Sequence, residues 1–218
     1  MQAQLIDGIF YITVLIMSIV IHEVAHGYSA YLLGDDTARL KGRLTLNPLK
    51  HLDPFGSVIL PLLLYFSTAG SFLIGWAKPV PYNPNNLRKG RLGNIIVAIS
   101  GVAANLIIAI VFGLLIRYGT ILGLPPYNPN PLIVHPFYKI SSIIVLMNLV
   151  LALFNLIPIP PLDGSKVLFS FLPVRLRYIE NFLERWGMIL LIIFLVSGLW
   201  SIISPIIFVL FSLLTGLH

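Results

Sequence analysis

The chain has 218 residues, of which 57% are apolar and only 10% are Asp, Glu, Lys or Arg. A soluble domain carries about 25% of such charged residues, so this composition excludes a cytosolic globule, a nucleic-acid-binding module and a disordered chain. The net charge of +6 is then explained by Lys and Arg in cytoplasmic loops rather than by nucleic-acid binding. There is no cysteine, so a metal site has to use His, Asp or Glu. The sequence predicts an integral, multi-pass protein of the lipid bilayer.

The apolar runs predict one all-α domain over residues 1–218, a bundle of about four to six membrane segments. The first helix is expected over about 5–33, ended by Gly34. Further runs cover about 55–76, 92–117, 139–157 and 186–217. Pro61 and Gly70 interrupt the run at 55–76, which favours a re-entrant segment, with a β-hairpin as one form it could take.

The distribution of Lys and Arg supports the re-entrant interpretation. Loops 34–54, 77–91 and 158–185 carry four each, whereas loop 117–139 carries two. If the second run enters the membrane and returns, twelve basic residues lie inside and two outside. If it crosses once, six lie on one side and eight on the other, and the bias disappears. The positive-inside rule therefore favours the first topology, with the N-terminus outside.

Residues 173–185 predict a short helix in the cytoplasmic membrane interface. Its apolar side chains fall on one face, which is typical of interfacial helices; they are Ile179, Phe182 and Leu183, followed by Trp186. The last apolar run, at 186–217, is interrupted by Gly198 and Pro205. The sequence leaves open whether this run crosses once with a kink or bends back.

Residues 22–26 read His-Glu-Val-Ala-His. On a helix, His22 and His26 lie one turn apart on one face and can bind the same metal ion. Glu23 beside them can serve as the carboxylate base for a metal-activated water. Ionisable groups at the end of a membrane helix are costly and usually functional. The alternative is that these side chains only extend into a cytoplasmic loop.

A catalytic zinc ion has three protein ligands, so a third one is needed. Asp163 is the best candidate, because it follows the run 139–157 within the segment 155–164. The prolines in that segment forbid a regular helix, and the freed backbone groups then imply a packed or wet cavity. The alternative is that Asp163 only caps the next helix. His135 on the outer loop and His218 at the chain end are poor candidates.

The predicted topology and the predicted metal site support each other. With a re-entrant second run, His22, His26 and Asp163 all lie near the cytoplasmic ends of inward-running helices. With a single crossing they would lie on opposite sides of the membrane, and one metal ion could not join them.

With these motifs the chain closely resembles the site-2 protease family (peptidase family M50), zinc metalloproteases that cut within the membrane. The matching pieces are the histidine motif at 22–26, Ser-Gly-Val-Ala-Ala-Asn at 100–105 and Asn-Leu-Ile-Pro-Ile-Pro-Pro-Leu-Asp-Gly at 155–164, and the segments 47–54 and 75–81 are similar to family signatures. Members commonly add a PDZ or CBS domain, so this chain is expected to be a minimal member.

The resemblance implies one zinc ion per chain, held by His22, His26 and Asp163, with Glu23 as the general base. It also implies that Asn155 contacts the substrate or the developing oxyanion, and that Asn105 belongs to the active site. The region 55–76 would engage the substrate as an extended strand.

Three of these positions have plain structural alternatives. Asn105 lies in a small-residue stretch and could simply form an interhelical hydrogen bond. Asn155 could satisfy backbone groups freed by the prolines. His51 could gate or contact the substrate as an accessory residue, or be a solvated loop histidine.

The expected function is zinc-dependent proteolysis of a membrane protein, for example a single-pass one, within regulated intramembrane proteolysis. The minimal form leads us to expect a prokaryotic inner membrane, with the active site toward the cytoplasm. The rival interpretations are a metal-ion or proton transporter and an inactive homologue that binds transmembrane helices. The sequence leaves open the substrate and its cleavage site, the need for a prior cut, the regulator, the oligomeric state and the organism.

Overall fold

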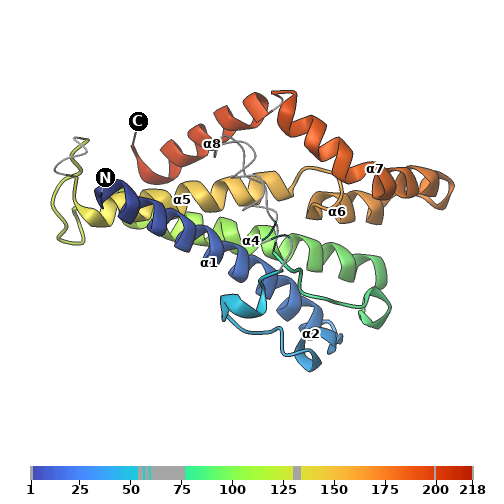
Figure 1. Ribbon diagram of the computed structural model, residues 1–218. Coiled ribbons are helices and arrows are strands. Elements are labelled where there is room, and N and C mark those ends of the chain that lie inside the picture. Colours follow the sequence, from blue (N-terminus) through green and yellow to red (C-terminus); the bar gives the residue numbers. More distant parts are fainter. Residues whose placement is uncertain are drawn as a thin grey trace.

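The computed structural model of the chain describes residues 2–53, 77–129, 134–198 and 200–217, together with Gly56 and Ile59. Within these ranges the fold is all-helical and contains no strand, as predicted. Three long helices lie side by side: α1 (Gln2–Leu32), α4 (Gly90–Arg117) and α5 (Pro136–Asn155) (Figure 1). The predicted re-entrant segment, 55–76, falls almost wholly outside the described residues.

The ends of the long helices follow local sequence signals. Gly34 adopts a left-handed conformation with φ 103°, and its N–H donates to the Tyr31 carbonyl (3.0 Å) while that of Asp35 donates to Ala30 (2.9 Å). This pair of bonds is the Schellman arrangement, which satisfies carbonyls that a helix end leaves free. At the start of α5, the His135 ring accepts the N–H of Phe137 (3.3 Å), so this histidine caps a helix. It lies outside the cluster of possible metal ligands found among the described residues.

Short helices fill the connections at one end of the bundle. They are α2 (Thr37–Leu40), the 3-10 turns η1 (Pro48–Lys50), η3 (Pro84–Asn86) and η4 (Val174–Leu176), and α6 (Asp163–Phe171). Each of the first two 3-10 turns begins with a proline after an asparagine cap, as expected of turn sequences.

The C-terminal part differs from the prediction. The chain forms α7 (Arg177–Val196) and α8 (Trp200–Thr215), so the expected interfacial helix at 173–185 is wrong as a separate element. From Arg177 onward its residues run without a break into the last apolar run, because no proline interrupts the stretch 177–196. The break comes at Gly198, with φ 76°, and the helices on either side are bent by 73°.

In the part of the chain that the structure describes, three helical stretches are long and apolar enough to cross a membrane, or four if α7 and α8 form one broken span. The apolar core lies where α4, α5 and α8 meet, at buried residues such as Ala109, Leu149 and Ile207. The outward faces of these helices also carry large apolar side chains, such as Ile107, which is 61% exposed. That surface suits hydrocarbon rather than water, in keeping with a multi-pass membrane protein.

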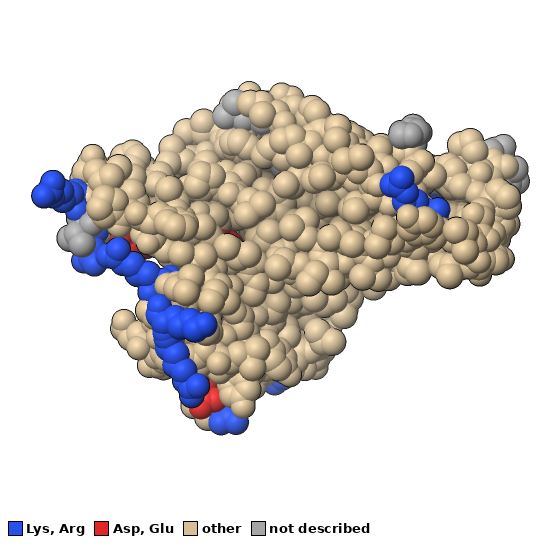
Figure 2. Space-filling model, turned by 180° about the vertical axis from the view of Figure 1, so that it is seen from behind, with Lys and Arg blue, Asp and Glu red and all other residues tan. Residues whose placement is uncertain are grey.

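The end of α1 and the start of α4 lie together. The N–H of Arg88 donates to the Leu33 carbonyl (2.8 Å), and Ala30 packs with Leu87 and Val97. The connection between the two helices therefore begins and ends at the same end of the bundle. Lys and Arg gather along one edge of the face in Figure 2, with a smaller group toward the opposite end.

Candidate metal centre

Two histidines of α1 form the base of the site. His22 and His26 lie one helical turn apart, and each is only 5% exposed. Their Nε2 atoms are 3.1 Å apart, and their rings meet edge to face with centroids 4.6 Å apart. The structure thus confirms that the two imidazoles converge on one point.

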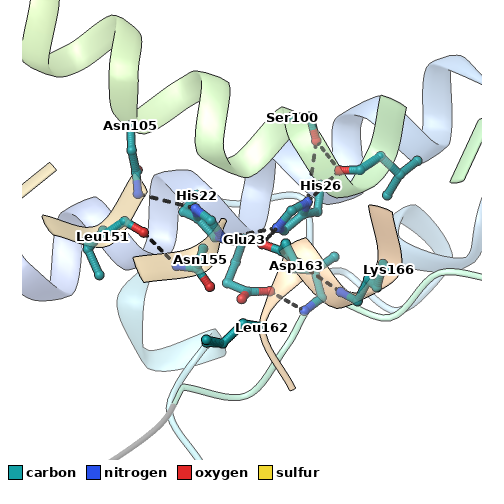
Figure 3. A network of polar contacts seen from close by, with 12 residues as sticks. His22, Glu23, His26, Ser100, Asn105, Leu151, Asn155, Leu162, Asp163 and Lys166 are labelled. Atoms are coloured by element: carbon teal, nitrogen blue, oxygen red, sulfur yellow. Dashed lines mark hydrogen bonds and ion pairs between the residues drawn. The ribbon is translucent and has the colours of Figure 1, made fainter. Parts of the chain in front are cut away.

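Asp163, the first residue of α6, completes the cluster. Its Oδ2 lies 2.9 Å from the Nε2 of His22 and 2.9 Å from that of His26, as Figure 3 shows. The alternative that Asp163 caps α6 is wrong, because Leu162 holds the cap position and Asp163 is the first helical residue. Its Oδ2 faces the two histidines.

The three donor atoms fit a divalent metal such as zinc. They form a nearly equilateral triangle with edges of 2.9, 2.9 and 3.1 Å. Ligands at 2.0–2.1 Å around a tetrahedral zinc ion would be about 3.3 Å apart, so a small outward shift would make room for it. Among the residues that the structure describes, this is the one group of three His, Cys, Asp or Glu side chains with such geometry.

Two glycines allow the elements to come this close. A Cβ on Gly101 of α4 would lie 2.5 Å from the Nε2 of His26 and 2.7 Å from that of His22. A Cβ on Gly164 would lie 2.2 Å from the Leu156 carbonyl oxygen, where α6 starts directly beneath the end of α5. Both glycines belong to the motifs that carry the family resemblance, and the close contacts explain why no side chain fits there.

Neighbouring groups orient the ligands. The Nδ1 of His26 lies 2.6 Å from the Val97 carbonyl, which also accepts the Ser100 hydroxyl (2.7 Å). Lys166 donates its Nζ to the Oδ1 of Asp163 (2.9 Å). Such partners fix the tautomer and direction of metal ligands. Sequence reasoning missed Lys166, although its spacing of three from Asp163 on a helix was a usable signal.

The Asp163 carboxyl is held in its charged form. Burial alone would raise its pKa, but the neighbouring side chains of His22, His26 and Lys166 hold the pKa well below the usual range. A charged carboxylate is the form that binds a metal ion.

Glu23 lies beside the donor triangle without being part of it. Its Oε2 accepts the backbone N–H of Val80 (2.8 Å) (Figure 3), which comes from the segment 75–81 noted in the sequence. This bond anchors one carboxylate oxygen and leaves the other, Oε1, for chemistry at the site.

The two asparagines have different surroundings. Asn105 of α4 is fully buried, and its Nδ2 lies 3.2 Å from the Nδ1 of His22, so the interhelical bond considered from the sequence is present. Asn155 is half-buried at the end of α5 and donates its Nδ2 to the Leu151 carbonyl (2.9 Å) within its own helix. Figure 3 shows Asn105 pointing toward His22.

His51 is not among the grouped ligands. The view of it as a solvated loop residue is wrong, because the side chain is only 1% exposed. Its Nε2 donates to the Thr45 carbonyl (2.8 Å), and its own backbone carbonyl accepts the N–H of Lys78 (2.8 Å). The histidine therefore joins the loops after α1 and before α4.

Comparison with known proteins points the same way. The model of the family described as Peptidase family M50 matches residues 127–198. "Putative zinc metalloprotease YwhC" of Bacillus subtilis (strain 168) is 38% identical over 192 residues, which cover 88% of this chain and 82% of that protein. "Putative zinc metalloprotease Rip2" of Mycolicibacterium smegmatis is 28% identical over 193 residues, 87% of this chain and 68% of that protein. No solved structure matches the chain.

Proposed function

Because this chain belongs to peptidase family M50, we propose that it is a zinc-dependent endopeptidase that cleaves a membrane protein within or next to a transmembrane segment. The observation that carries the proposal is the buried triangle of His22, His26 and Asp163 with Glu23 beside it. His22, Glu23 and His26 lie on α1, which is long enough to span the bilayer. Ionisable side chains are costly in such a helix and usually have a function.

His22, His26 and Asp163 would hold the zinc ion. Zinc bound by three protein ligands supplies a Lewis acid and a water whose pKa is lowered to about 7. The protein contributes the buried setting and the partners of each ligand, Val97 for His26 and Lys166 for Asp163. These contacts would keep the donor triangle in place while a substrate enters.

Glu23 would act as general base and then as general acid. It takes a proton from the attacking water and delivers it to the leaving amine of the cut peptide bond. The Val80 N–H holds its Oε2, so the carboxylate keeps one orientation through both steps. The amide of Asn155 is the proposed contact for the oxyanion, after release from the Leu151 carbonyl.

A transmembrane substrate hides its peptide bonds in helical hydrogen bonds. It must therefore unwind locally before its carbonyl can reach the site, and an extended segment can be held by pairing with another extended segment. We assign that role to the region 55–76. We also place the site toward the cytoplasm, since most Lys and Arg lie in the loops at the same end of the bundle.

The test combines bound metal with cleavage in purified protein, using wild type, Glu23→Gln and Asp163→Asn and a generic single-span substrate. We expect about one zinc per chain and cleavage in wild type, zinc without cleavage in Glu23→Gln, and weakened zinc binding in Asp163→Asn. Cleavage by Glu23→Gln at the wild-type rate would contradict the mechanism. Zinc binding without any cleavage, together with zinc flux into liposomes, would favour a transporter.

A further inference from the structure

We infer that Asn105 is a positioning residue for the metal centre: its side-chain oxygen accepts the Nδ1–H of His22 and so keeps the Nε2 lone pair of that ring free for the metal. The inference rests on the metal site proposed above. It gives Asn105 a different role from a contact with the substrate or the oxyanion.

His26 shows how a hydrogen bond at Nδ1 sets the tautomer of a metal-binding histidine. A backbone carbonyl can only accept a hydrogen bond, so the Val97 oxygen, 2.6 Å from Nδ1, requires a proton on that nitrogen. In a neutral imidazole the other nitrogen, Nε2, then carries the lone pair. That Nε2 faces Asp163 at 2.9 Å, so His26 is set in its metal-binding tautomer by the backbone.

His22 needs the same tautomer, because its Nε2 also faces Asp163 at 2.9 Å. The described neighbour of its Nδ1 is the Asn105 amide, at 3.2 Å. If the amide nitrogen faces the ring, Nδ1 has to accept and Nε2 has to carry the proton, which excludes metal binding. If the amide oxygen faces the ring, Nδ1 donates and Nε2 is free.

The two amide orientations have the same shape, so packing does not choose between them. Their own hydrogen bonds do not choose either. With Nδ2 against the ring, Oδ1 is buried without a partner among the described residues, and turning the amide leaves Nδ2 there instead. The tautomer of His22 therefore decides. This ring binds a metal through Nε2 only with its proton on Nδ1, and only the amide oxygen of Asn105 can accept a hydrogen bond from that proton.

The burial of Asn105 distinguishes a role in positioning His22 from a direct contact with the substrate. Asn105 is 0% exposed and contacts the Nδ1 side of His22, while the donor triangle is formed by the Nε2 side. A substrate carbonyl would reach the metal from the open side of that triangle. Asn155, which is half-buried, remains the better placed amide for that contact.

The chain offers a matched control in Asn148 of α5. This asparagine is also 0% exposed, donates its Nδ2 to the Ser18 hydroxyl (3.0 Å) and has an Oδ1 without a partner among the described residues. It contacts no metal ligand in the described hydrogen bonds. Asn148→Leu therefore reports the cost of losing a buried membrane amide, and Asn105→Leu adds the loss of the histidine contact.

The experiment measures the zinc dissociation constant in detergent by competition with a metallochromic chelator, for the full chain and three variants. We expect Asn105→Leu to bind zinc about 10- to 100-fold more weakly and Asn148→Leu to bind it like wild type. Asn105→Asp should retain the affinity, because a carboxylate can accept from Nδ1 but cannot donate to it. If circular dichroism shows that Asn105→Asp does not fold, the two leucine variants decide.

Equal zinc affinity in wild type and Asn105→Leu would overturn the inference. It would also be overturned if Asn148→Leu, or a folded Asn105→Asp, lost as much zinc affinity as Asn105→Leu. Those results would leave the metal centre and the protease proposal intact. A wild-type chain that binds no zinc would overturn the metal centre and this inference with it.

Discussion

At Gly101 the missing side chain sets how closely α4 approaches the two histidines. We predict that Gly101→Ala weakens zinc binding by about tenfold or more, because overpacking of this kind costs about 1–3 kcal/mol and the new Cβ would lie against both Nε2 atoms. Zinc titration of the purified variant measures this.

Gly93 on the same helix is the control for that prediction. A Cβ there would meet the Leu87 Cβ at 3.2 Å, away from the metal ligands. Gly93→Ala should therefore keep the zinc affinity of wild type. A Gly101→Ala protein that binds zinc as tightly as Gly93→Ala would show that α4 can move aside at no cost to the site.

At the scale of elements, Asp35 ties the end of α1 to the turn before α4. Its buried carboxylate accepts the Thr37 hydroxyl (2.6 Å), the Asn83 N–H (2.8 Å) and the Asn86 amide (2.8 Å). Burial alone would raise its pKa, but these hydrogen bonds hold the pKa below the ordinary value. The carboxylate thus joins two segments that flank the undescribed connection.

This contact predicts a pH dependence. A lowered folded-state pKa means that the stabilisation is complete above the ordinary carboxyl pKa of about 3.9 and is lost as the pH falls through the lower folded value. We expect Asp35→Asn to lower the free energy of unfolding by about 1–3 kcal/mol at neutral pH and to remove this acid dependence, as measured by thermal unfolding in detergent.

Asp36→Asn serves as the comparison, because the ion pair of Asp36 with Arg39 (3.0 Å) is about half-exposed on both sides and such pairs contribute little. If the two substitutions lower the unfolding temperature equally, the Asp35 hydrogen bonds do not hold the two segments together.

A second prediction at this scale concerns the substrate helix. If local unwinding limits cleavage, prolines or glycines placed near the scissile bond should speed cutting, since each weakens a helix interior, by about 1 kcal/mol for glycine and about 3 kcal/mol for proline. The measurement is the initial cleavage rate across a substrate series, with the same residues placed at the far end of the span as the control. Unchanged rates across the series would show that unwinding is not limiting.

At the scale of the whole molecule, the arrangement of α1, α4 and α5 fixes which loops share a side of the membrane. Because the chain has no cysteine, single cysteines can be labelled against no background. We predict that a membrane-impermeant maleimide reaches exposed Lys41→Cys and Lys89→Cys from the cytoplasmic side and exposed Thr120→Cys from the other. Labelling of Lys41→Cys and Lys89→Cys from opposite sides would contradict the topology.

Much of this could be predicted from the sequence, because the signals are local. Apolar length gives the spans, Gly34 ends α1, and a spacing of four on a helix puts His22 and His26 on one face. Asp163 is also predicted as the candidate third ligand, because proline breaks and the lack of cysteine leave few candidates. The sequence does not predict that the helix at 177–185 continues as α7 to Val196, since an amphipathic pattern shows a face but not where a helix ends.

The tertiary structure alone decided which groups contact the ligands from other elements. Val97 faces His26, Asn105 faces His22 and Val80 anchors Glu23, each across at least 57 residues of sequence. The burial of His51 is of the same kind. Such contacts depend on how closely the helices pack. Glycines at helix crossings control that distance, and no local pattern in the chain encodes it. The sequence by itself determined the donor set and the spans, and packing decided the hydrogen bonds that orient those donors.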